Sequence, residues 1–131
     1  MKSSLTANAA FAAGGLLLAQ MAPAQAGSIS TPILLLGAAN QIMCIANNVT
    51  PQTINNVTVT IVGTNGNSTK TCNIGPSDPD GCRTFRSNDQ GYCVISVAGL
   101  TPAQTAARLR GSLLTRTTTQ PYTVHAVVQA Q

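Results

Sequence analysis

The chain has no tryptophan, no glutamate and a single histidine among its 131 residues, and only 8% of its residues are charged. Aromatic residues amount to 3%. A pair of catalytic carboxylates or a histidine relay needs side chains that this sequence scarcely contains, so most hydrolytic mechanisms are disfavoured. Because large aromatic rings are so few, the core must be built mainly from valine, isoleucine, leucine and alanine.

The few side chains that could carry chemistry are scattered along the chain. A serine hydrolase would have to combine His125 with partners such as Ser112 and Asp89, but no Gly-x-Ser-x-Gly pattern is present. Residues 75–81 contain Asp-x-Asp-Gly, a fragment of a calcium loop, but proline, glycine and aspartate are also what tight turns require. We therefore predict no catalytic residue, no metal site, no cofactor and no enzymatic activity.

The first 26 residues have the three parts of a secretory signal peptide. Lys2 precedes an apolar stretch over 9–19, and Ala24-Gln25-Ala26 places small residues where a signal peptidase requires them. The apolar stretch is shorter than the about 20 residues that cross a membrane. The sequence therefore predicts a cleavable signal peptide over 1–26, a single domain over 27–131, no membrane span, and a secreted or periplasmic protein.

All four cysteines follow the predicted cleavage site. An even number in a small exported domain indicates two disulfides, for which three pairings exist. A zinc site is disfavoured because the sequence contains no Cys-x-x-Cys. Cys72 and Cys82 flank the turn-rich residues 75–81, so we expect them to pair and to hold the two ends of that loop together. Cys44 and Cys93, each in an apolar segment, are then expected to pair across the domain.

Alternation of apolar and polar residues dominates the chain after the signal peptide. In 56–62, valine and isoleucine alternate with threonine, which indicates a strand with one buried face. Asn65-Gly66 favours a hairpin turn after it. Thr101 as a cap and Pro102 as the first helical residue favour one helical turn over 101–107. Strands are expected over 28–36, 41–47, 56–62, 69–74, 82–85, 92–97, 109–117 and 122–128.

Seven or eight short strands at intervals of about ten residues are typical of a β-sandwich or a β-barrel. Pro32 lies within the first expected strand, which suggests a sheet edge or a bulge there. We predict an all-β, immunoglobulin-like sandwich of antiparallel strands held by two disulfides. A small β-barrel is the alternative.

Positive charge exceeds negative charge only modestly, with seven lysines and arginines against three aspartates. The spread lacks the dense basic stripe of a nucleic-acid-binding protein, so no nucleic-acid partner is expected. Arg108, Arg110 and Arg116 share parity, so in a regular strand they would project from one face. They are candidates for contact with an anionic surface or polymer. Arginines that guard a solvated strand against edge pairing would produce the same pattern.

Several short motifs follow one another in order along the domain. They are Cys44 with Asn47, Val57-x-Val59-x-Ile61, Gly66, Tyr92-Cys93-x-Ile95-x-Val97-x-Gly99 and Arg110-Gly111-Ser112-Leu113. This set resembles a group of small exported bacterial proteins, each little more than a signal peptide and one sandwich-like domain without assigned activity. The resemblance implies a bacterial origin and supports the pairing of Cys44 with Cys93. It brings no functional residues with it.

The sequence leads us to expect a non-enzymatic module of the envelope or the extracellular space. Its partner would be an unknown protein or an anionic polymer of the envelope or surface. One alternative is a subunit of a fibre or surface assembly built by strand addition, with the apolar segment Ile29 to Leu36 as the donor. Another is a secreted enzyme or an enzyme inhibitor, and catalysis would then depend on His125.

Overall fold

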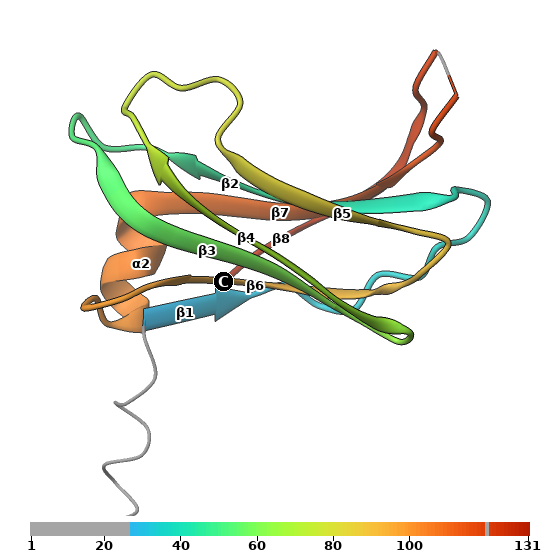
Figure 1. The fold of residues 1–131 in the computed structure, drawn as a ribbon, viewed down its shortest axis with the longest axis horizontal. Coiled ribbons are helices and arrows are strands. Elements are labelled where there is room, and N and C mark those ends of the chain that lie inside the picture. The colour runs from blue at the N-terminus through green and yellow to red at the C-terminus, as the bar shows by residue number, and fades with distance from the viewer. Residues whose placement is uncertain (1–26, 120) are drawn as a thin grey trace, which may run out of the picture.

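Two antiparallel sheets of four strands face each other in the fold (Figure 1). The computed structural model describes residues 27–119 and 121–131, so the signal peptide expected over 1–26 lies outside the described residues. In the first sheet the strand order is β1-β6-β3-β4, and in the second sheet it is β5-β2-β7-β8. The elements are β1 Gly27–Ser30, β2 Gln41–Asn48, β3 Ile54–Gly63, β4 Gly66–Ile74, β5 Cys82–Ser87, β6 Gly91–Val97, α2 Pro102–Arg108, β7 Leu109–Arg116 and β8 Val124–Gln129.

Alternate residues of the central strands fill the space between the sheets. In β6, Cys93, Ile95 and Val97 are at most 4% exposed, and the residues between them are partly exposed. The Cys44–Cys93 disulfide joins β2 to β6 and so ties the two sheets through inner strands, as in immunoglobulin domains. The predicted all-β, immunoglobulin-like sandwich is confirmed. Over the described residues the sheets do not close into the small barrel that was the alternative.

The two lateral seams of the sandwich are held by different contacts. At one seam the Cys72–Cys82 disulfide joins β4 to β5 across the turn-rich loop. At the other seam Gln131, just beyond β8, exchanges backbone hydrogen bonds of 3.0 and 3.1 Å with Ser30 of β1. Both expected disulfide pairings are therefore confirmed. A disulfide joins the sheets at one seam, and backbone hydrogen bonds join them at the other.

The N-terminal strand is shorter than the sequence pattern predicts. β1 ends at Ser30 rather than at residue 36, because Pro32 has no N–H to donate to a ladder. Leu34 then rejoins the sheet through a single bridge to Gly91 of β6. Pro32 thus interrupts an edge strand, which is the role that its position suggests.

The expected helical turn is a short helix, α2. Thr101 is its N-cap and Pro102 opens it, and Thr101 and Gln104 form a capping box. The Thr105 hydroxyl donates a hydrogen bond of 2.8 Å to the carbonyl of Gly27, which docks the helix against β1. No helix in the described part of the chain is long and apolar enough to cross a membrane.

Candidate binding surfaces

The residues considered for catalysis are not assembled into a site. Ser112 on β7 lies opposite Gln129, and the exposed His125 lies four positions before Gln129, which places it about 13 Å away along the sheet. Asp89 lies in the turn before β6, where hydrogen bonds from the surrounding turns occupy its carboxylate. The structure therefore does not bring His125, Ser112 and Asp89 together.

The loop over 75–81 shows the contacts of a turn. The Asp78 carboxylate accepts a hydrogen bond of 2.9 Å from the N–H of Asp80, as in an Asx turn. Asp80 in turn forms a surface ion pair of 3.0 Å with Arg83. Among the residues that the structure describes, no three His, Cys, Asp or Glu side chains are grouped so that they could hold a metal ion.

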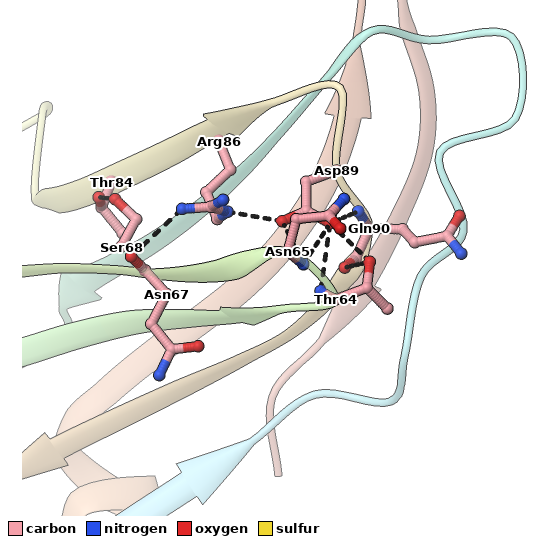
Figure 2. A network of polar contacts seen from close by, with 8 residues as sticks. All are labelled: Thr64, Asn65, Asn67, Ser68, Thr84, Arg86, Asp89 and Gln90. Carbon is pink, nitrogen blue, oxygen red and sulfur yellow. Dashed lines mark hydrogen bonds and ion pairs between the residues drawn. The ribbon is translucent and has the colours of Figure 1, made fainter.

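Asp89 is the centre of a buried polar network (Figure 2). It is 3% exposed, and its carboxylate accepts hydrogen bonds from six donor atoms. Thr64 donates its N–H and its hydroxyl, the latter at 2.6 Å, and Asn65 donates its N–H and its side-chain amide. Arg86 donates Nε at 2.7 Å, and Gln90 donates its N–H at 2.8 Å. Asp89 thus ties the β3–β4 turn to the β5–β6 turn.

This network sets the position of the β3–β4 turn. The sequence pattern predicts a turn at Asn65-Gly66, but Gly63 pairs with Gly66, so Thr64 and Asn65 form the loop. The Asp89 carboxylate binds the N–H groups of both loop residues. A Cβ at Gly63 would collide with that carboxylate, so glycine is needed for the close approach. The hairpin is confirmed, and a contact distant in sequence places its loop one residue earlier.

The surroundings of Asp89 favour its ionised form. The hydrogen bond from the Thr64 hydroxyl is the largest influence on its pKa, and burial opposes that influence. The ion pair with Arg86 and the N–H groups of Gln90 and Asn65 add to the lowering, so the pKa of Asp89 lies well below its ordinary range. With its side chain 1% exposed, the carboxylate offers no open oxygen to a ligand, and we interpret Asp89 as a structural residue.

We expect Asp89 to make folding stability depend on pH. Because its folded pKa lies below the unfolded value of about 3.9, the carboxylate stabilises the fold above that pH. This contribution begins to fall below about pH 4 and is lost as the pH falls through the lowered pKa of the folded state. In Asp89→Asn the urea midpoint should be lower than wild type at about pH 7 and should vary less between about pH 5 and pH 2.

Asp80→Asn is the matched control, because Asp80 also pairs with an arginine three positions away but does so at the surface. Exposed pairs contribute little, so this variant should keep the wild-type midpoint and pH profile. If the pH profiles of Asp89→Asn and wild type coincide, the buried network does not contribute as described.

The outer face of the second sheet carries an apolar row that crosses all four strands. The register aligns Phe85 of β5 with Met43 of β2, Met43 with Leu114 of β7, and Leu114 with Val127 of β8. We call these four residues the apolar row. Phe85 and Val127 at its ends are 48% and 50% exposed, whereas Met43 in the middle is buried. Exposed apolar side chains that line up on one face are typical of a surface that contacts a partner.

Two of the three candidate arginines flank this row. Arg110 and Arg116 lie on β7 with the parity of the outer face, about 20 Å apart. Arg108 instead ends α2, so the shared parity in one strand holds only for Arg110 and Arg116. Arg116 donates Nε to Gln41 at 2.7 Å and lies 4.9 Å from the centre of the Tyr122 ring. The outer face of the second sheet therefore combines the apolar row with the positive charges of Arg110 and Arg116, and the exposed Arg83 of β5 adds a third.

The outer face of the first sheet has a different chemistry. Thr58 and Thr60 of β3 lie opposite Thr71 and Thr69 of β4, and the hydroxyls of each pair are 3.0 and 3.1 Å apart. Cross-strand threonine pairs of this kind stabilise a sheet. The two outer faces thus differ, because the first presents paired hydroxyls and the second presents the apolar row and its arginines.

An open apolar pocket of about 330 Å³ lies beside the Asp89 network. Ile33, Val62 and Tyr92 supply its apolar walls, and Thr64 and Gln90 supply polar atoms. The described residues that line it include no carboxylate, histidine, cysteine or cation. The pocket suits an uncharged, mainly apolar group.

Sequence reasoning missed the apolar row and the network around Asp89. One usable signal for the row is that 41–47 contains apolar residues at both parities, so its outer face cannot be fully polar. The same holds for Leu113 and Leu114 in 109–117. No comparable signal marks Asp89, because a lone aspartate in a turn is ordinary.

Comparisons with known proteins add no relative to this picture. A scan against protein-family models, a search of curated proteins and a search of solved structures each found no match. The resemblance to small exported bacterial sandwich proteins therefore stays a prediction.

Proposed function

We propose that this chain is an exported, non-enzymatic module that attaches to the anionic lipid surface of a cell envelope through the outer face of its second sheet. Export to the periplasm or the medium is supported by the signal-like residues 1–26 and by two disulfides, which persist in oxidising compartments. The resemblance to exported bacterial proteins points the same way. A non-catalytic role is supported by the separation of His125 from Ser112 and by the hydrogen bonds that occupy the Asp89 carboxylate.

The observation that carries this proposal is the apolar row between two arginines. Phe85 and Val127 offer exposed apolar side chains to the boundary between lipid headgroups and acyl chains. Arg110 and Arg116 offer positive charge to the phosphates. An anionic polysaccharide would engage the arginines but leave the apolar row in water. A lipid surface therefore accounts for more of this face.

Co-sedimentation with lipid vesicles tests the proposal. The oxidised protein should bind vesicles of phosphatidylglycerol and phosphatidylethanolamine. Its affinity for phosphatidylcholine vesicles should be at least about tenfold lower. Arg110→Ser/Arg116→Ser should lose about thirtyfold in affinity, since each cation near an anionic leaflet contributes about 1 kcal/mol. Phe85→Ser should also bind more weakly while it keeps the fold, because its side chain is half exposed.

A matched pair of single variants controls for net charge. Arg110→Ser and Lys70→Ser each remove one positive charge, but Lys70 lies on β4 of the first sheet. Only Arg110→Ser should weaken vesicle binding. Equal losses in the two variants would show non-specific attraction and refute the assigned face. Binding to an anionic polysaccharide without binding to vesicles would refute the lipid surface.

The strand-donor alternative meets a constraint in the fold. Ile29 is buried and pairs with Ile95 of the same domain. Leu34 and Leu36 also pack against the core of their own sandwich. Donation of the segment from Ile29 to Leu36 to another molecule would require the release of all these contacts.

A further inference from the structure

β8 forms one edge of the second sheet, and the parity of its hydrogen bonds shows which backbone groups face away from β7. The N–H of Ala130 donates to the carbonyl of Gly111 at 2.9 Å, in register with the β7–β8 pairing. In an antiparallel ladder, alternate residues of a strand direct their backbone N–H and C=O groups toward the strand on one side, and the residues between them direct theirs toward the other side. Val127 and Gln129 therefore direct their backbone N–H and C=O groups outward.

A second contact agrees with this parity. Gln131 has the same parity as Val127 and Gln129, and it uses its outward groups to exchange hydrogen bonds with Ser30 of β1. Just beyond β8, the same outward edge of the chain thus already pairs with the backbone of β1 at one position. Among the described residues, no hydrogen bond reaches the outward backbone groups of Val127 or Gln129.

The other sheet edges carry features that oppose strand pairing. β4 and β5 are joined by the Cys72–Cys82 disulfide, and Arg86 of β5 donates Nη1 to the carbonyl of Asn67 on β4 at 3.2 Å. β1 has four residues and is soon followed by Pro32. β8 contains no aspartate, glutamate, lysine, arginine or proline, which are the residues that protect natural edges.

The open part of β8 is short. At one end, a register shift against β7 makes the ladder irregular at His125. At the other end, the outward backbone groups of Gln131 are already hydrogen-bonded to Ser30. Between these limits only Val127 and Gln129 are free. A long partner strand would gain no further pairs. An identical strand related by a two-fold axis would match both free positions at once.

We propose that β8 pairs with β8 of a second copy of this chain around a two-fold axis at Val128. Val127 then exchanges its backbone hydrogen bonds with Gln129 of the second copy, and Gln129 does so with Val127 of the second copy. The contact is isologous, so it closes and does not propagate into a fibre. The second sheet of one copy, which has four strands, then joins the second sheet of the other copy into one continuous sheet.

The side chains at this seam are compatible with self-pairing. Val127 lies on the outer face and is 50% exposed, and the two copies of Val127 come to lie diagonally across the axis, about 7–8 Å apart. The nearest arginines on the outer face, Arg110 and Arg116, belong to β7 and not to the edge strand. The dimer also places two apolar rows on one surface, which would raise its avidity for a membrane. The proposed membrane attachment does not require the dimer.

Sedimentation velocity of the oxidised protein from about 1 µM to about 1 mM tests the proposal. Wild type should shift from monomer to dimer as the concentration rises. Val127→Pro should stay monomeric and keep the wild-type urea midpoint, because the N–H that it removes faces outward. Val127→Lys should also stay monomeric, because the two lysines would lie diagonally across the axis and their like charges would repel each other. If Val127→Pro does not fold, Val127→Lys carries the test.

Val49→Lys is the matched control, since Val49 and Val127 are both 50% exposed and Val49 lies outside β8. It should dimerise like wild type. A wild type that remains monomeric at about 1 mM overturns the proposal. A Val127→Lys dimer as stable as wild type, or equal loss of dimer in both lysine variants, overturns it as well. Vesicle binding by a protein that stays monomeric would leave the proposed attachment intact, so the two proposals fail separately.

Discussion

Loss of the Cys44–Cys93 disulfide in Cys44→Ala/Cys93→Ala should lower the free energy of unfolding by about 4 kcal/mol. The two cysteines are 49 residues apart, and closing a loop of that length removes much of the entropy of the unfolded chain. Small domains have a total stability of about 5–15 kcal/mol. With so few aromatic residues in its core, the domain would therefore keep only a small free energy of unfolding. Urea unfolding followed by far-ultraviolet circular dichroism measures the loss.

The double variant Cys72→Ala/Cys82→Ala is the comparison, because it opens a loop of only 10 residues. The same reasoning assigns it a loss of about 3 kcal/mol. Cys44 and Cys93 are also fully buried between the sheets, so their truncation removes packing as well. If the short bridge proves the more stabilising of the two, then the chain-entropy account is wrong for this domain.

Leu113→Ala should lower the free energy of unfolding by about 2–5 kcal/mol, the range for a leucine removed from a packed interior. Leu113 has no exposed surface and lies on the inner face of β7 opposite Cys44. Its neighbour Leu114 lies on the outer face and is only half-buried. Leu114→Ala should therefore cost roughly 1 kcal/mol. Urea denaturation of the oxidised variants gives both values.

The two leucine variants should also separate stability from binding. Leu114 belongs to the apolar row, so Leu114→Ala should weaken vesicle binding although it stays folded. Leu113→Ala should bind as wild type under conditions in which it is folded. Similar stability losses in the two variants would contradict the inward–outward alternation of β7, on which the whole outer face depends.

Much of the secondary structure is readable from local sequence. Alternation in β3 places Val57, Val59 and Ile61 inward, and all three are fully buried. Thr101 caps α2 as its position before Pro102 predicts. These features depend on residues within a few positions of one another, where a strand period of two or a helix cap operates. The disulfide pairs are readable too, because turn-rich residues separate Cys72 from Cys82 and leave the other two cysteines to pair.

The sequence by itself determined the all-β class and the helix cap, placed the turns to within a residue, and favoured the two cysteine pairs that the structure contains. Tertiary structure alone decided the apolar row, the surroundings of Asp89 and the open edge at Val127. Each of these features depends on how strands distant in the chain are placed against one another. Phe85 meets Met43, and Asp89 meets Thr64, only through such placement. A local pattern states which face a side chain takes, but not which neighbour will lie beside it.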